Sequence, residues 1–231
     1  MKRFAAVLKA NYPDQILSHL RSTRLAPRSN VHLARKIWHM SMGLMMAAIY
    51  MSGMSRGAAI LTLGAALALV IGFEMIRLRI PSLNEKVTRV LGPIMRSSEI
   101  NQVSGIAYYI SAVILSIAIF PKTIAILSVL YLAVGDPVAS FVGITYGSKT
   151  PRLADGKSLA GTAAGILACF LVGVIFLSSI GLSIPMTLLL AVIGGVSGGV
   201  AELLPLEIDD NFSIPIVSGF ALWLTFIVAG I

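Results

Sequence analysis

The sequence has few charged residues and only one cysteine. Charged residues make up 12% of its 231 residues and hydrophobic residues 57%, whereas about a quarter of a soluble domain is charged. So few charges do not cover the surface of a water-soluble fold of this size, which argues against a soluble enzyme. The single cysteine, Cys169, lies in an apolar run. It therefore excludes an intramolecular disulfide framework and a zinc site built from cysteines.

Long apolar runs dominate the chain instead. Each has roughly the 17–25 residues that cross a bilayer as a helix. They predict an all-α integral membrane protein with about seven transmembrane helices, over 37–54, 57–76, 104–120, 122–143, 159–179, 184–204 and 212–230. Three prolines lie at or near span starts, where a missing N–H costs little: Pro121, Pro185 and Pro215.

Two stretches are too polar to span a membrane. Residues 1–34 mix basic and apolar residues, which predicts a retained cytoplasmic segment, either a helix lying on anionic lipid or a solvated basic tail. Residues 77–103 predict a short cytoplasmic amphipathic helix that carries Val87, Val90, Leu91 and Ile94. The remainder, 35–231, is expected to form one transmembrane domain.

The basic residues predict the orientation of the chain. Eight precede the first span, five lie in 77–103 and three in 144–158, whereas only Arg56 and Lys122 fall on the opposite side. Because cytoplasmic loops are enriched in Lys and Arg, the N-terminus is expected in the cytoplasm and the C-terminus outside. The inner loop 205–211 is exceptional, since it carries acids and no base.

Under this topology the polar residues gather at the inner boundary of the membrane. A transporter, the alternative from another functional class, needs a polar route through the bilayer, with ionisable groups near its midplane. The outer halves of the expected helices offer only Ser, Thr and Gly. The pattern therefore favours chemistry at the cytosolic interface.

Asp136, in the segment LAVGDPVASFVG, lies inside an apolar span. A carboxylate there costs about 2.5–3.5 kcal/mol on insertion scales and normally faces a partner or a cavity. Asp136, Ser140 and Gly143 share one helix face, and Gly135 and Pro137 allow a break in the helix. The alternative is an acid that pairs with a base on a neighbouring helix.

Basic residues mark two further segments. Arg35 and Lys36 begin the first span and His39 lies one turn deeper, where they are either site residues or interface anchors with a structural histidine. In YGSKTPRLADGKSLAGT, Pro151 stands where a phosphate loop has its first glycine, so that motif fails. A basic loop entering a helix remains, and its N-terminal amides and Lys157 are expected to receive phosphate, unless the bases only mark an inner loop.

The segment GGVSGGVAELLPLEIDDNFSIP combines small residues with acids. Its glycines are expected to pack helices: Gly194, Gly195, Gly198 and Gly199. Asp209 and Asp210 either cap the last helix or hold a divalent cation shared with a phosphate.

Together these segments resemble the CTP-dependent lipid kinases. That family includes the fungal CTP-dependent diacylglycerol kinases, phytol kinase and dolichol kinase, and is related more distantly to phosphatidate cytidylyltransferase. The diacylglycerol kinase branch is the most similar. The resemblance covers roughly 35–219 and rests on RKIWH, FEMIRL, MRSSEINQVSG, GDPVASFVG, YGSKTP, GKSLAGT and DDNFSIP, in that order. One departure is Pro137, where the family commonly has a small hydroxyl residue or alanine.

The resemblance implies transfer of the γ-phosphoryl group of CTP to a membrane lipid alcohol, with Mg²⁺ as cofactor. Diacylglycerol is the first expected substrate, followed by polyprenol, dolichol or phytol. A cytidylyltransferase is the alternative enzyme. The other expected partner is the bilayer; no nucleic acid is expected, and a homodimer through the glycine faces is left open.

The resemblance implies roles for Arg35, Lys36, Asp136 and Gly143, and the mechanism adds the other polar residues of the inner boundary. Which carboxylate is the base and which binds metal stays open. The expected catalytic residues are Arg35, Lys36 and Asp136. Nucleotide binding is expected at Arg35, Lys36, His39, Gly143, Lys149, Lys157 and Ser158. The metal is expected at Asp136, Asp209 and Asp210.

Overall fold

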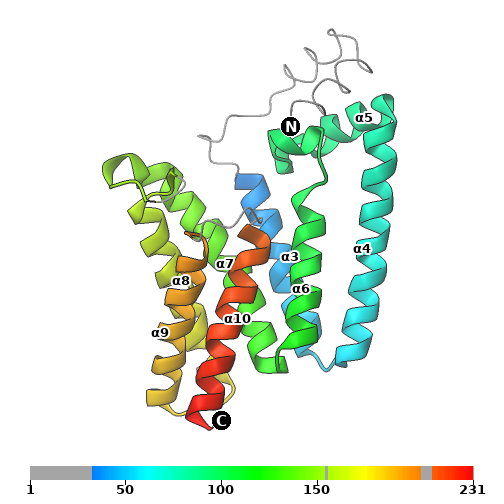
Figure 1. Ribbon diagram of the computed structural model, residues 1–231. Helices are drawn as coiled ribbons and strands as arrows, with labels where there is room; N and C mark the ends of the chain where they lie inside the picture. The colour runs from blue at the N-terminus through cyan, green and yellow to red at the C-terminus, as the bar shows by residue number, and fades with distance from the viewer. Residues whose placement is uncertain (1–32, 154–155, 204–209, 231) are drawn as a thin grey trace.

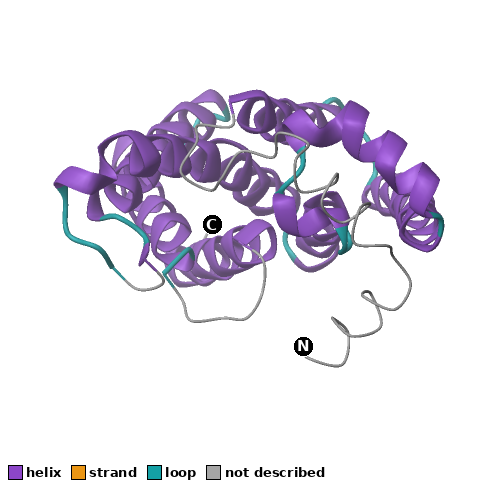
Figure 2. Cartoon of the chain, turned by 90° about the horizontal axis from the view of Figure 1, so that it is seen from above, coloured by secondary structure: helices purple, strands orange, loops and turns teal. Residues whose placement is uncertain are grey.

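The computed structural model describes residues 33–153, 156–203 and 210–230 (Figure 1). Within these ranges Figure 2 shows only helices and loops, apart from an isolated bridge between Arg152 and Ser158 that forms no sheet. The all-α prediction is confirmed. The predicted segment 1–34, except Leu33 and Ala34, and the predicted metal ligand Asp209 lie outside the described residues.

Each of the seven expected spans coincides with a long helix of the described chain. Their bounds are α3 Leu33–Met51, α4 Arg56–Arg79, α6 Gly105–Ile119, α7 Lys122–Tyr146, α8 Leu159–Ser179, α9 Ile184–Ala201 and α10 Asp210–Ala229. Five of them, α4 and α7 to α10, are long and apolar enough to cross a membrane. The chain is therefore a membrane protein, and the full count of seven spans stays a prediction.

The polar stretch 77–103 forms a short helix, as expected. Helix α5, Pro81–Leu91, lies across one end of the bundle and is followed by two 3₁₀ turns, η1 Gly92–Ile94 and η2 Ser97–Ile100 (Figure 1). Pro81 occupies the first turn of α5, where its missing N–H leaves no acceptor unsatisfied. We call this end of the bundle the polar end and the opposite one the far end.

Helix α7 forms the centre of the bundle. It packs against α3, α6, α8, α9 and α10, whereas α4 packs only against α6 and α5 among the larger helix contacts. In the most apolar window, 67% of the α7 residues are buried, against 11% for α4. The side chains of Leu127, Tyr131 and Leu132 on α7 are fully buried. The core therefore surrounds the helix that carries Asp136.

The glycines of α9 pack helices, as predicted. A Cβ atom on Gly195 would lie 3.0 Å from the backbone nitrogen of Phe170 on α8, and one on Gly199 would lie 3.0 Å from that of Ile166. Gly194 and Gly198 face Tyr131 and Cys169. These faces are covered inside the chain, so they add no support for the homodimer.

Two prolines lie in the interiors of long helices. Pro121 is the N-cap of α7 and Pro185 lies in the first turn of α9, but α10 begins earlier than expected and contains Pro215 in its interior. The break that Pro137 would allow does not form, because α7 runs continuously from Lys122 to Tyr146. The close packing of other helices around α7 keeps it helical despite the one backbone hydrogen bond that proline cannot donate.

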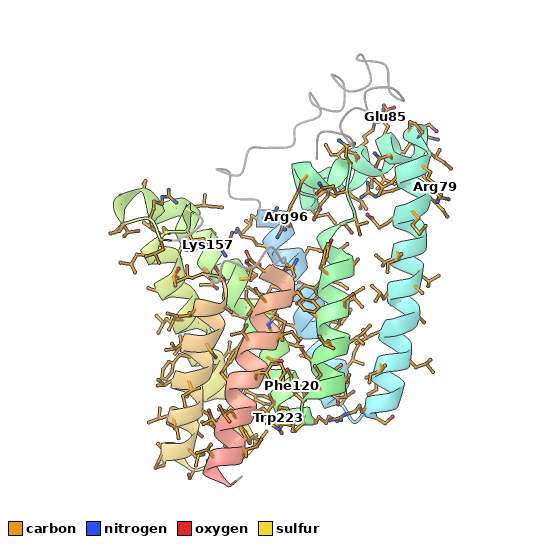
Figure 3. The ribbon with its side chains drawn as sticks, in the orientation of Figure 1. Arg79, Glu85, Arg96, Phe120, Lys157 and Trp223 are labelled. Carbon is orange, nitrogen blue, oxygen red and sulfur yellow. The ribbon has the colours of Figure 1, made fainter. Side chains whose placement is uncertain are left out.

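At the far end, aromatic residues pack together and two bases link neighbouring helices. Phe120 makes an edge contact with Trp223 at 6.1 Å between ring centroids, and both lie at the far end in Figure 3. Arg56 donates to the carbonyl oxygen of Phe120 at 2.7 Å, and the Lys122 ammonium lies 4.9 Å from the centroid of the Tyr50 ring. Both bases therefore join helices.

Candidate active site

A cavity of about 740 Å³ opens at the polar end of the bundle, a volume typical of small-molecule sites. We call it the polar-end pocket. Its walls come from α3, α6, α7, the start of α8 and the start of α10, and from the α5 to η2 segment. The predicted site residues that line it are Arg35, Lys36, His39, Asp136, Gly143, Lys157, Ser158 and Asp210. Residues far apart in the sequence thus meet in one cavity.

Lys149 does not line this pocket. It ends the 3₁₀ turn Gly147–Lys149 and its side chain is exposed. Lys157, in the same basic loop, instead lies between the ends of α8 and α10 (Figure 3). The structure therefore separates two lysines that the sequence placed together.

Asp136 reaches the pocket from α7 with 23% of its side chain exposed. Its Oδ2 lies 3.7 Å from Nε2 of His39. That nitrogen also lies 3.2 Å from the carbonyl oxygen of Leu132, to which it donates, because a carbonyl only accepts. His39 thus joins α3 to α7 and orients toward Asp136, while the carboxylate stays accessible from the pocket.

Lys36 joins the same two helices. It is 7% exposed, and its ammonium donates a hydrogen bond to the hydroxyl of Ser140, one turn beyond Asp136 on α7. Arg35 lies beside it on α3 and also lines the pocket. The predicted basic pair therefore faces the side of α7 that carries the carboxylate. A pair that only anchored the helix in lipid headgroups would face the lipid instead.

Lys157 lies among acidic groups. Its Nζ is 2.6 Å from the carbonyl oxygen of Glu202, 3.1 Å from Oδ2 of Asp210 and 3.6 Å from Oε2 of Glu202. The sequence did not single out Glu202 as a site residue. Its signal was a lone acid directly after an apolar, glycine-rich helix, where positive charge is the rule.

The carboxyl of Glu202 is almost buried, with 8% of the residue exposed, just beyond the end of α9 at Ala201. Burial raises the pKa of Glu202 to about 8, the charge of Asp136 adds to the rise, and Lys157 opposes it. Additional positive charge in the pocket would therefore favour the ionised form of Glu202.

The start of α8 is closed by internal hydrogen bonds. The first three of its amides already have acceptors, which argues against the phosphate binding that the sequence left open there. These bonds run from Leu159 N to Pro151 O at 3.0 Å, from Ala160 N to Thr150 Oγ1 at 3.3 Å and from Gly161 N to Ser158 Oγ at 3.1 Å. Ser158 is the N-cap of α8, so anion binding falls to side chains.

Three glycines bring this loop against α7. A Cβ atom on Gly161 would lie 2.8 Å from the carbonyl oxygen of Ala139, and one on Gly143 would lie 3.2 Å from Oγ of Ser158. Gly156 has φ +73°, a conformation that side chains disfavour. The predicted site residue Gly143 therefore contributes by its small size, which lets Ser158 approach α7.

Three buried hydroxyls in the pocket wall, those of Thr162, Ser104 and Tyr109, have no hydrogen-bond partner among the described residues. Thr162 lies on α8, Ser104 directly precedes α6 and Tyr109 lies on α6. Sequence reasoning missed them, although Thr162 follows Ser158 by one helical turn and so shares its face. Buried hydroxyls usually have partners, so these three are suited to a polar ligand.

A second set of charges forms the wall above these groups. We call Glu74, Arg77, Asn84 and Glu99 the roof network. Arg77 is fully buried and binds both carboxylate oxygens of Glu74, at 3.0 and 2.7 Å, Oδ1 of Asn84 at 2.6 Å and the carbonyl oxygen of Glu99 at 2.8 Å. Glu99 in turn accepts the backbone N–H of Gly105 at 2.8 Å. This network fixes α5 and η2 over the bundle.

The pocket offers oxygen ligands for a divalent cation. Across the described ranges, no group of three or more His, Cys, Asp or Glu side chains is arranged to hold a metal ion. Mg²⁺ at nucleotide sites needs only one or two carboxylates, because phosphate oxygens and waters complete its shell. Asp136, Glu202 and Asp210 all line the pocket, so the donor chemistry fits.

The chain is similar to fungal enzymes named CTP-dependent diacylglycerol kinase 1. The Schizosaccharomyces pombe protein is 33% identical over 204 residues, which cover 83% of this chain and 92% of that protein. The Saccharomyces cerevisiae protein is 30% identical over 207 residues, 80% of this chain and 70% of that protein. The Eremothecium gossypii protein is 32% identical and aligns over 80% of this chain and 64% of its own length. No family model and no solved structure matches the chain.

Proposed function

This chain belongs to the CTP-dependent lipid kinase family, in its diacylglycerol kinase branch, and from that membership we propose that it phosphorylates diacylglycerol with CTP. The hydroxyl oxygen of the lipid forms a bond to the γ-phosphorus as the bond to the bridging oxygen of CDP breaks. The products are phosphatidate, CDP and the proton of the hydroxyl.

One structural observation supports the polar-end pocket as the site of this reaction. Bases and acids from separate helices, namely Arg35, Lys36, Asp136, Lys157 and Asp210, line a single cavity at one end of an apolar bundle. Phosphoryl transfer depends mainly on charge neutralisation and alignment, and a cavity with both signs of charge supplies them. Its position at the end of a membrane bundle suits a soluble donor and a lipid acceptor.

The bases hold the triphosphate. Arg35, Lys36 and Lys157 are the candidates, helped by the guanidinium of Arg152, which also lines the pocket. Lys157 exchanges its contacts with Asp210 and Glu202 for phosphate oxygens. The hydroxyls of Thr162 and Ser104 donate further hydrogen bonds to the nucleotide.

Asp136 orients the lipid hydroxyl and accepts its proton. Its carboxylate is accessible, and Nε2 of His39 lies 3.7 Å from it. A general base contributes roughly 10²–10⁴-fold to a rate when it lies within reach of the transferred proton. His39 is a positioning residue in this scheme, because it acts on Asp136.

Asp210 and Glu202, which both line the pocket, would hold Mg²⁺, and the ion would supply positive charge to balance the negative charge of the nucleotide's phosphates. Burial raises the pKa of Glu202, and a cation bound beside it would favour the ionised form that a metal ligand needs.

The proposed enzyme crosses the membrane several times with its polar end in the cytosol. The support is the distribution of bases in the described residues, most of which lie in segments at that end. Arg56 and Lys122 are the exceptions, and both join helices at the far end. CTP then enters from the cytosol.

Purified protein in nanodiscs, supplied with γ-labelled CTP and Mg²⁺, tests the proposal. We expect labelled phosphatidate and equimolar CDP from dioleoylglycerol, and less product from dolichol or phytol. Pyrophosphate and CDP-lipid formed from phosphatidate would instead show a cytidylyltransferase. No CDP with any lipid alcohol would exclude the kinase.

A further inference from the structure

The polar-end pocket has a second, apolar part that the phosphoryl-transfer scheme does not use. It is lined by residues of α3, of α6 and of the α5 to η1 segment. We call it the apolar chamber and define it by Met42, Met46, Leu91, Ile94, Met95 and Ile110.

The chamber extends deep along α3. Arg35, His39, Met42 and Met46 follow one another at helical spacing on one face, and all four line the pocket. At 1.5 Å per residue, Met46 lies about 16 Å below Arg35, which is roughly half the thickness of a bilayer's hydrocarbon core. CTP has no apolar part that would occupy such a depth.

Two aromatic rings separate the chamber from the charged groups. His39 and Tyr109 make an edge contact with 4.6 Å between ring centroids, which joins α3 to α6. Asp136 contacts the same histidine. A lipid seated in the chamber with its hydroxyl at this boundary therefore places the hydroxyl beside Asp136.

The chamber lies between helices that have little packing on one another. Helix α3 packs on α7 and η1, whereas α6 packs on α4, α7 and α10, and the pair α3 and α6 is not among the larger contacts. The roof network holds α5 above this gap. A lipid therefore has a lateral route from the bilayer that needs no separation of tightly packed helices.

We propose that the apolar chamber seats diacylglycerol, with its glycerol end at the boundary formed by His39 and Tyr109 and its acyl chains leaving between α3 and α6 beneath α5. This inference rests on the proposed kinase function and adds where the acceptor binds. Three of the six chamber residues are methionines, whose flexible side chains adapt to chains of different shape.

A pair of matched variants tests the chamber kinetically. Met42→Trp fills it, whereas Met45→Trp places the same side chain on the exposed face of α3. We expect Met42→Trp to raise the KM for dioleoylglycerol in mixed micelles about tenfold or more, because the indole ring occupies space in the chamber that the lipid needs. The KM for CTP stays within about twofold of wild type in both variants, since neither residue lies among the charges. Equal effects of the two variants, or a rise in the KM for CTP alone, would contradict the proposal.

Photolabelling of the wild-type protein tests the chamber without turnover or a mutation. The probe is a diacylglycerol with a diazirine next to its glycerol end, in nanodiscs of phosphatidylcholine. We expect labels on Met42, Met46 or Ile110, displaced by excess dioleoylglycerol and not by excess dioleoylphosphatidylcholine.

The two experiments also separate this inference from the proposed function. Labelling of the chamber without any CDP formation would support the lipid site and contradict the proposed kinase function. Phosphatidate and CDP could instead form while the labels lie only on the lipid-facing side of α4, or while excess dioleoylglycerol fails to displace them. Either result would support the kinase function and contradict the lipid site in the chamber. If Met42→Trp does not fold, Ile110→Phe replaces it in the same assay.

Discussion

The roof network and the charges of the polar-end pocket lie at the same end of the bundle but use their hydrogen bonds differently. Arg77 is fully buried and bound to two oxygens of Glu74, to Asn84 and to backbone carbonyls. Asp136 and Lys157 keep 23% and 25% of their side chains exposed, and the ion pair of Asp136 is long, at 3.7 Å.

This difference teaches how to distinguish structural from functional charge in an apolar protein. A buried charge with every bond satisfied has nothing left for a ligand and stabilises one conformation. A charge with an accessible side and an exchangeable partner is available for chemistry. The two clusters should therefore respond oppositely to mutation, one in stability and the other in activity.

The largest effect is expected from Asp136→Asn. Loss of the proposed base should lower turnover about 10²–10⁴-fold, while the isosteric amide leaves the fold intact. The measurement is CDP release from CTP and dioleoylglycerol, with size-exclusion and thermal unfolding profiles as the control. Turnover above a tenth of the wild-type rate would show that Asp136 is not the base.

Arg77→Met is expected to act on stability. Removal of one partner leaves Glu74 buried and unpaired, at a cost of about 3–5 kcal/mol, measured by thermal unfolding in detergent. The double variant Glu74→Gln/Arg77→Met should recover part of the loss, because no charge is then left alone. A stable but inactive Arg77→Met variant would show that Arg77 acts in catalysis and not in the stability of the roof network.

Lys157→Met should weaken CTP binding. A hydrogen bond to a charged group contributes about 1.5–3 kcal/mol, so the KM for CTP should rise about 10- to 100-fold, with a smaller change in the KM for lipid. Lys149→Met is the matched control, since Lys149 is exposed outside the pocket. An equal rise in the KM for CTP in the two variants would show that Lys149 also binds the nucleotide.

Gly161→Ala should disturb the contact between α7 and α8 that holds Ser158 in place. Its Cβ would lie 2.8 Å from the carbonyl oxygen of Ala139, and overpacking of this kind costs roughly 1–3 kcal/mol of stability. Gly72→Ala on α4 meets no atom within 4 Å and should be neutral or stabilising by up to about 1 kcal/mol. Thermal unfolding of both variants compares them, and equal losses would contradict the packing role.

The smallest effect is expected from Glu85→Gln. Glu85 pairs with Arg89 on α5 at 2.9 Å, but the two side chains are 38% and 68% exposed, and Glu85 lies at the outer rim in Figure 3. Exposed pairs of this kind contribute about 0.5 kcal/mol or less. Thermal unfolding and CTP turnover should both match wild type, and a large change in either would show that α5 has an undetected contact.

Helix positions and the main charged residues were predictable for the same reason. Apolar runs of membrane length are rare in other folds, and a charge within one, such as Asp136, is costly enough to need an explanation. Arg35, Lys36 and Lys157 were expected on one side of the membrane from the distribution of bases, and the structure places them around one pocket. These features follow from local composition.

Burial and contact partners were not predictable, because lipid and protein core are equally apolar. The most apolar windows of α4 and α7 have mean hydropathies of 2.2 and 1.8, yet only α7 is central. The bonds that close the start of α8 depend on Pro151 and Thr150 folding back on it. Lys149 is exposed outside the pocket and Lys157 lines it, and this difference depends on the turns between them, which composition does not reveal.

The paired state of Lys157 has a consequence for the catalytic cycle. Its ammonium is already engaged by Asp210 and Glu202, so an arriving anion must compete with two carboxyl groups for it. Such competition weakens the retention of any phosphate-bearing molecule, and it equally hastens departure of the spent nucleotide, because the lysine has partners to return to. The enzyme would thereby give up affinity in exchange for rapid emptying between rounds of reaction.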